Sequence, residues 1–119
     1  MDVTPSKNDI SEKKYFHKIL KNMCGRHNPN YYKKYKKWCD EYFYLPHREE
    51  TRGIGGIFFD YKKKNFEKNF SFVRDVGVTF QEIFNKIIQR KIKKKWTIKD
   101  KEEQYIKRGR YAEFNLLYD

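Results

Sequence analysis

The spacing of the large apolar side chains is the feature of this sequence that most constrains its fold. Three segments place such residues three or four positions apart, which is the period of a helix with one buried face. These residues are Phe16, Ile19, Leu20 and Met23 in the first segment, Tyr31, Tyr35, Trp38, Tyr42 and Leu45 in the second, and Phe70, Val73, Val76, Phe80, Phe84, Ile87 and Ile88 in the third. The pattern predicts three amphipathic helices.

Capping and helix-breaking residues set the expected ends of the first two helices. Asp9 or Ser11 is suited to cap the first helix, because a short side chain with an oxygen can accept from free backbone N–H groups. Gly25 is suited to end that helix. The sequence Asn28-Pro29-Asn30 predicts a tight turn, and Pro46 is expected to stop the second helix.

The rest of the chain is predicted to form a fourth helix and two strands. Thr97 is suited to cap a polar helix, which Gly109 is expected to break. Residues 54–60 form a short apolar run that opens on glycines, and residues 110–119 alternate in part, so both segments are expected to be strands. Glycine inside a strand marks a place where a ligand or another element approaches the backbone. The fold class predicted is α+β.

Composition places this chain among folded proteins. The 119 residues fit one small domain, and although only 38% are hydrophobic, 18% are aromatic and can supply a core. The formal net charge of +12 suits an anionic partner such as nucleic acid, acidic lipid or a polycarboxylate. Compositional drift toward lysine on solvated faces is the alternative explanation of this charge.

Cys24 and Cys39 are expected to be buried thiols on helix faces, because the sequence has no CxxC pair. The N-terminal residues contain no secretory apolar region, and no segment has the length and hydrophobicity of a membrane span. The cytoplasm is therefore the expected location.

The densest candidate site is the segment from His47 to Gly56. Arg48 and Arg52 lie four positions apart, and a guanidinium fork pairs well with a carboxylate. Gly55 and Gly56 would let a ligand come close to the backbone. The segment therefore suits a ligand with several acid groups, and an ordinary surface cluster of ion pairs with the neighbouring glutamates is the competing interpretation.

Other candidate residues carry less information on their own. His17 and His47 are residue types that bind metals, but thirty positions separate them. Asp2 and Asp119 are isolated carboxylates. The sequence contains no Walker loop, GxGxxG, HExxH or nucleophile elbow, and its lysine-aromatic stretches match no nucleic-acid-binding module.

Several stretches together resemble the oxygen-dependent coproporphyrinogen oxidases in order and spacing. They are Asp2-Val3-Thr4-Pro5, residues 35–43 (YKKWCDEYF), His47-Arg48, residues 52–60 (RGIGGIFFD), residues 108–111 (RGRY) and residues 113–116 (EFNL). The resemblance covers essentially the whole chain, while the chain covers less than half of a typical family member. It implies that residues 1–119 are an internal piece of one oxidase domain, truncated at both ends.

The resemblance implies oxidative decarboxylation of two propionates of coproporphyrinogen III, with molecular oxygen as co-substrate, no organic cofactor, and protoporphyrinogen IX as product in haem biosynthesis. Arg48 and Arg52 match positions that hold propionates. Asp2 and Asp119 match aspartates associated with the active site, so Asp2, Arg52 and Asp119 are the expected catalytic residues.

The resemblance also implies a metal, a fold and partners. His17 and His47 match two histidines described as ligands of a divalent metal, such as manganese, in bacterial members. The implied fold is an antiparallel sheet flanked by helices on both faces, usually in a homodimer. No nucleic acid and no membrane span are implied, and a complementing fragment is a further expected partner.

This chain departs from the family pattern at Glu49, where many members have glycine, and at Tyr61, where they have a second aspartate. Because the family's upstream and downstream substrate residues have no counterpart here, the isolated chain is expected to be inactive. The alternative function is a noncatalytic remnant or a basic, anion-binding helical module.

Overall fold

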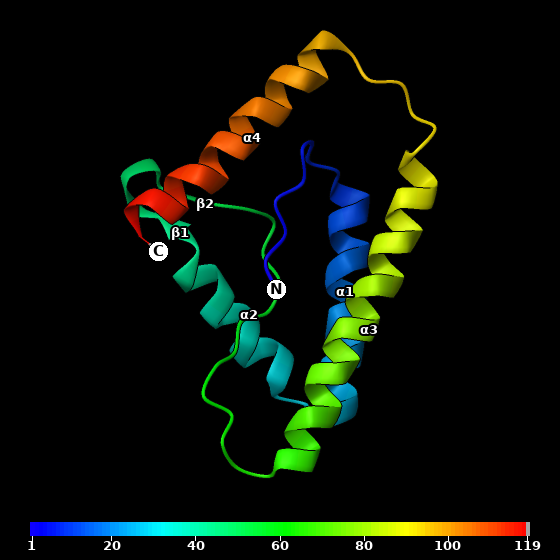
Figure 1. Cartoon of the computed structure of the whole chain (residues 1–119), viewed down its shortest axis with the longest axis vertical. Helices are drawn as coiled ribbons and strands as arrows, with labels where there is room; N and C mark the ends of the chain where they lie inside the picture. The colour runs from blue at the N-terminus through cyan, green and yellow to red at the C-terminus, as the bar shows by residue number, and fades with distance from the viewer. Residues whose placement is uncertain (119) are drawn as a thin grey trace.

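The computed structural model describes residues 1–118, and Asp119 lies outside the described residues. The elements are α1 (Ile10–His27), α2 (Tyr31–Tyr42), β1 (Tyr44–Leu45), the 3-10 helix η1 (Pro46–Arg48), β2 (Glu50–Thr51), α3 (Phe66–Lys91) and α4 (Ile98–Leu117). Figure 1 shows α1 and α3 side by side, with α4 running back from the far end of α3 to the hairpin. The structure is mostly helical with one small antiparallel sheet, which is compatible with the predicted α+β class.

The core forms where α1 packs against α2 and α3. Phe16, Leu20 and Met23 are buried on α1, as their helical spacing predicts. They meet Phe72 and Ile83, which are buried on α3. Since burying one such side chain stabilises a protein by about 1.5–3 kcal/mol, this cluster is the main source of cohesion.

Asp9 caps α1, because its Oδ1 accepts hydrogen bonds from the backbone N–H groups of Ser11 (3.0 Å) and Glu12 (3.1 Å). The expected end at Gly25 was wrong by two residues. The helix continues to His27, because Gly25 keeps a helical backbone instead of the positive φ by which glycine usually ends a helix.

The strand predicted at residues 54–60 is wrong. This segment instead lies along residues 1–3, with one antiparallel bridge between Asp2 and Gly56. The backbone hydrogen bonds of this contact include those from Ile54 N to the carbonyl of Val3 (2.9 Å) and from Val3 N to the carbonyl of Gly55 (3.3 Å), while Phe58 N donates to the carbonyl of Tyr35 on α2 (3.0 Å). The two short strands of the sheet are β1 and β2, where Tyr44 pairs with Thr51.

The strand predicted at residues 110–119 is also wrong over the part that the structure describes, because α4 runs through Gly109 to Leu117. Thr97 caps the helix in a capping box with Asp100, as the sequence suggested. A single glycine costs a helix only about 1 kcal/mol. The residues Tyr111, Phe114 and Tyr118 have helical spacing that favours one packed face over strand alternation.

Both cysteines are free and buried, as predicted. Burial raises the pKa of the Cys24 thiol to about 11 and that of the Cys39 thiol to about 12, so both remain protonated near neutral pH. Among the helices of residues 1–118, none has the length and apolar character needed to cross a membrane.

Candidate active site

Asp2 and Arg52 form a buried ion pair between the N-terminal segment and the residue that follows β2. Asp2 Oδ2 accepts from Arg52 Nε at 3.1 Å and lies 3.0 Å from Arg52 Nη2. The exposed fraction is 1% for the Asp2 side chain and 8% for that of Arg52. Burial raises the pKa of Asp2, and the neighbouring guanidinium partly offsets this rise. Two of the predicted catalytic residues are therefore in direct contact.

Aromatic rings surround the guanidinium of Arg52. Its central carbon lies 4.0 Å from the ring centre of Phe43, 4.7 Å from that of Tyr111 and 4.9 Å from that of Phe114. Nη1 also donates to Asn115 Oδ1 at 3.4 Å. Stacking on aromatic faces suits the planar guanidinium and fixes its orientation. The residue after β2 thus connects the N-terminal segment to α4.

The backbone of the N-terminal segment lies directly against two of the glycines near Arg52. A Cβ on Gly56 would lie 2.0 Å from the Met1 carbonyl oxygen, and one on Gly53 would lie 2.3 Å from that of Val3. Gly55 has a φ of 88°, which side-chain-bearing residues rarely adopt. Close approach by another element was one of the two explanations expected for glycine here, and residues 1–3 are the element that approaches Gly53 and Gly56.

A small polar cavity of about 300 Å³ lies beside this pair. It is lined by Thr4, Pro5, Asn8, Asp9, Ile10, Lys13, residues 50–54 and Lys107. The hydroxyl oxygen of Thr4 is buried and has no hydrogen-bond partner among the described residues. The charged side chains of this lining are Lys13, Lys107 and Arg52 together with Asp9 and Glu50, so the cavity can accept a small polar group.

Arg48 lies in a second, exposed cluster with His47 and Glu113. Glu113 accepts from Arg48 Nε and from His47 Nε2, each at 2.7 Å, and His47 Nδ1 lies 2.9 Å from the hydroxyl of Tyr118. The hydrogen bond from Arg48, followed by that from His47, lowers the pKa of Glu113 to about 2. Arg48 and Arg52, both predicted substrate ligands, therefore have different intramolecular carboxylate partners.

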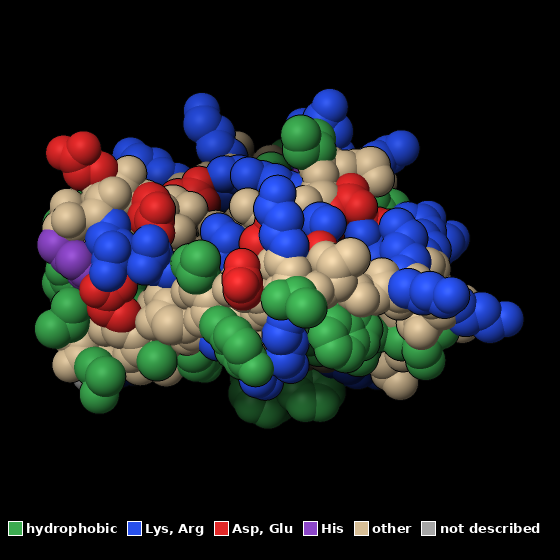
Figure 2. All heavy atoms as spheres, turned by 90° about the horizontal axis from the view of Figure 1, so that it is seen from above, with side chains coloured by type: hydrophobic (Ala, Val, Ile, Leu, Met, Phe, Trp, Pro, Cys, Tyr) green, Lys and Arg blue, Asp and Glu red, His purple; other side chains and the backbone are tan. Residues whose placement is uncertain are grey.

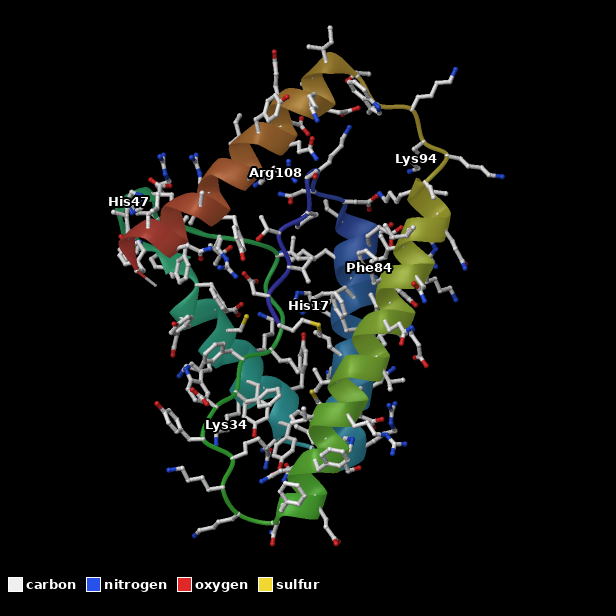
Figure 3. The ribbon with its side chains drawn as sticks, in the orientation of Figure 1. His17, Lys34, His47, Phe84, Lys94 and Arg108 are labelled. Atoms are coloured by element: carbon white, nitrogen blue, oxygen red, sulfur yellow. The ribbon has the colours of Figure 1, made fainter. Side chains whose placement is uncertain are left out.

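The two histidines predicted to bind a metal are not brought together. His17 Nε2 lies 2.8 Å from the carbonyl of Ile54, so this nitrogen carries the hydrogen, and Nδ1 lies 3.1 Å from the hydroxyl of Tyr32. Burial lowers the pKa of His17. Figure 3 shows His17 in the middle of the molecule and His47 at the end of α4.

Within residues 1–118, no group of three histidine, cysteine or acidic side chains is arranged to hold a metal. Both ring nitrogens of His17 and of His47 already have polar partners in the protein. Within the described residues, the donor set therefore does not form a metal centre.

A wide groove of about 1070 Å³ runs beside α1 and α2. Lys21, Lys33, Lys36 and Lys37 line it together with Asp40 and Glu41, which pair with two of these lysines. Figure 2 shows Lys and Arg side chains spread over much of one face, with hydrophobic groups exposed between them. The groove carries an excess of positive charge that the sequence predicted only as a bulk property.

Sequence reasoning missed the partners of the two arginines. Glu113 lies 65 positions along the chain from its partner Arg48. Two of the three rings around Arg52, those of Tyr111 and Phe114, come from α4, and the third is that of Phe43. Arg108 and Arg110 were also singled out in the sequence, within the stretch 108–111. Of these two, Arg110 forms an ion pair near the site, with its Nε 2.5 Å from Glu50 Oε1. No local spacing pattern could have indicated these contacts.

Helices around a short antiparallel hairpin, with Arg52 beside a polar cavity, are compatible with an α+β protein. The sequence profile described as coproporphyrinogen III oxidase matches residues 1–119. The chain belongs to this family.

Curated relatives named oxygen-dependent coproporphyrinogen-III oxidase come from Rickettsia akari (strain Hartford), Rickettsia rickettsii (strain Sheila Smith) and Rickettsia bellii (strain OSU 85-389). Each is 50% identical to this chain over 119 residues. The match covers 99% of this chain and 43% of each relative. The chain thus spans less than half the length of the curated relatives it matches.

Proposed function

We propose that this chain supplies part of an oxygen-dependent coproporphyrinogen III oxidase, an enzyme of haem biosynthesis. The observation that carries the proposal is 50% identity, along 99% of the chain, to relatives named for this activity. Residues 1–119 would then form part of one oxidase domain, in which the helices flank an antiparallel sheet larger than the hairpin described here. A homodimer in the cytoplasm is part of the same proposal.

The proposed reaction converts two propionate groups of coproporphyrinogen III into vinyl groups and gives protoporphyrinogen IX. In each step the propionate loses carbon dioxide and a hydrogen, and two electrons pass to one molecule of oxygen. With one proton taken from solvent, the balanced products are a vinyl group, carbon dioxide and hydrogen peroxide. Because oxygen takes the electrons, the proposal includes no organic cofactor.

Four residues carry the proposed substrate contacts. Arg48 is the more exposed arginine, so a propionate can replace Glu113 on its guanidinium. Arg52 and Asp2 are proposed to act as a pair, with Asp2 as the acceptor for pyrrole N–H groups once a substrate carboxylate binds Arg52. Asp119 remains a proposed catalytic residue that lies outside the described residues.

Gly55 and Gly56 are proposed to contribute to substrate binding only indirectly, by allowing the N-terminal segment to hold Asp2 against Arg52. A metal bound through His17 or His47 stays a prediction. We assign no step to it, since the two side chains lie apart and each is already hydrogen-bonded.

A chimera provides the test of this function. The matched 43% of the Rickettsia akari relative is replaced by this chain, and the product is incubated aerobically with coproporphyrinogen III. Porphyrins are then separated and measured by fluorescence. We expect the chimera to reach within about tenfold of the relative's rate, and the isolated chain to give no protoporphyrin above background.

The controls separate a catalytic defect from misfolding. In the chimera, Asp2→Asn and Arg48→Gln are expected to lower the conversion rate, while Lys33→Gln, on the remote groove, leaves it unchanged. A chimera that folds and yet converts no substrate would contradict the proposed function.

The positively charged groove favours a second candidate, a noncatalytic module that binds anions. Such binding would weaken steeply as the salt concentration rises, because it depends on release of counterions. Titration of the isolated chain with a labelled oligonucleotide at two salt concentrations tests it, and Lys33→Gln with Lys21→Gln is the matched variant. Unchanged binding in this double variant rules out the groove as the site.

A further inference from the structure

An exposed apolar stripe runs along α3 from Phe66 to Ile88. Its members recur at helical spacing and are each between 40% and 79% exposed. The stripe consists of Phe66, Phe70, Val73, Phe80, Phe84 and Ile88. Gly77 occupies the same face between Val73 and Phe80, and a Cβ there would meet no atom within 4 Å.

The stripe is separate from the face of α3 that packs on α1. That face carries Phe72, Thr79 and Ile83, all of which are buried. The apolar surface of α3 is therefore wider than α1 covers, and α3 has a second face without a covering element among residues 1–118. Figure 1 shows α3 at one side of the molecule, and Phe84 can be found on it in Figure 3.

The aromatic rings of the stripe already lie parallel to their neighbours. Phe66 stacks on Phe70 with ring centres 6.0 Å apart, and Phe80 stacks on Phe84 at 5.8 Å. A contiguous apolar surface of this kind is uncommon on a monomer and marks an interaction site. Stacked rings also lose little conformational entropy when a partner binds.

The candidate occupant of the stripe is the part of the oxidase polypeptide that this chain does not match. More than half of the length of each relative lies outside the region that matches this chain. A helix with two apolar faces fits a domain in which it lies between two layers. A second copy of this chain fits less well, since each copy carries a net charge of +12 and the two would repel each other.

We propose that the α3 stripe is a docking surface for an apolar face of the oxidase polypeptide that lies outside the matched region. The same surface would be covered in both cases, whether that polypeptide is joined to this chain or binds to it as a separate molecule. The inference rests on the proposed family domain, and it does not depend on catalytic activity.

The test measures the accessibility of one position on the stripe and one position beside it. Phe84→Cys and Val78→Cys place thiols on the same helix, on and off the stripe, at residues that are 52% and 46% exposed. Both native cysteines are buried with raised pKa values, so they react slowly. Each variant is treated with iodoacetamide, alone and within the Rickettsia akari chimera, and labelling is located by peptide mass spectrometry.

We expect position 84 to react readily in the isolated chain and at least about tenfold more slowly in the chimera. Position 78 should react at similar rates in both. Equal labelling of position 84 in the two proteins overturns the proposal. Protection that appears in the isolated chain as its concentration rises also overturns it, because the occupant would then be a second copy.

Two further measurements guard against disruption by the substitution itself. Phe70→Cys repeats the test at another stripe position, and hydrogen exchange of wild-type α3, alone and in the chimera, needs no substitution. Slower exchange in the chimera is expected. Stripe-dependent binding of the isolated chain to anionic vesicles, together with an unprotected stripe in the chimera, would assign the surface to a membrane and contradict the proposal. Thiol labelling and hydrogen exchange do not use substrate. The docking proposal can therefore fail while the conversion assay succeeds, and it can hold while the conversion assay fails.

Discussion

Arg52 is the residue on which several parts of this chain converge. It lies just after β2, pairs with Asp2, and stacks against rings from both the end of α2 and α4. A buried charge is tolerated only when it is paired and well oriented. The same features that stabilise this guanidinium fix its position, as the proposed contact with a substrate carboxylate requires.

Replacing Arg52 with methionine is expected to destabilise the chain by about 3–5 kcal/mol, because the buried Asp2 carboxylate loses its partner. Urea unfolding followed by circular dichroism measures this loss. Arg48→Met breaks an exposed pair that solvent screens, so its loss of stability should be much smaller than that of the Arg52 variant. Similar losses in the two variants would mean that Asp2 and Arg52 are not buried together.

Gly56→Ala is expected to destabilise the chain by about 1–3 kcal/mol, since the new methyl group would overlap the Met1 carbonyl oxygen. Gly25→Ala is the matched control: its Cβ meets nothing within 4 Å, and alanine favours the helix by up to about 1 kcal/mol. Thermal unfolding of both variants checks the opposite signs. A neutral Gly56→Ala would show that residues 1–3 do not lie against this segment.

At the scale of elements, α4 differs most from the sequence-based expectation. It is capped at Thr97 and passes through Gly109 without a break. Its last turns are held by Phe114 in the aromatic cluster and by Glu113, which binds His47 and Arg48. The helix is therefore fixed mainly at its C-terminal half.

Gly109→Ala is expected to stabilise the chain by up to about 1 kcal/mol and to raise its helical circular dichroism signal, because position 109 lies in a helix interior with open space around it. Urea unfolding at pH 7 provides the measurement. If residues 110–118 formed a strand after a break at Gly109, the substitution would give no gain in helicity.

Acidification is expected to release α4 from the η1 turn. The folded-state pKa of Glu113 is about 2, against an ordinary value of 4.5, so the stabilisation is complete above about pH 4.5 and is lost as the pH falls toward 2. Unfolding measured from pH 7 to pH 2, with Glu113→Gln as the control, isolates this effect. The variant should lack the stabilisation at neutral pH and depend less on pH, and identical pH profiles would contradict the assignment.

At the scale of the whole molecule, cohesion is uneven. The buried core joins α1, α2 and α3, whereas Phe114 is the one buried residue of α4 within the described chain. The α3 stripe leaves further apolar surface uncovered. Apolar burial therefore holds α1, α2 and α3 together more strongly than it holds α4.

Hydrogen exchange should reproduce this unevenness. Amides in the buried turns of α1 are expected to exchange at least about tenfold more slowly than those in residues 98–108 of α4, because few apolar contacts hold that part of the helix. Exchange followed by mass spectrometry at neutral pH measures both regions in one sample. Equal protection would indicate that α4 folds as one unit with the core.

The sequence alone indicated that four helices exist, that both thiols are buried, the α+β class and the family, because periodicity, capping and motif spacing are local properties. It did not give the ends of the second and fourth helices, which the structure places at Tyr42 and Leu117. Tertiary structure decided what these patterns could not. Residues 54–60 satisfy their backbone partly against residues 1–3, and residues 110–117 remain helical because Tyr111 and Phe114 pack on Arg52. The partners of both arginines likewise depend on contacts between segments 50 or more positions apart, which no local pattern encodes.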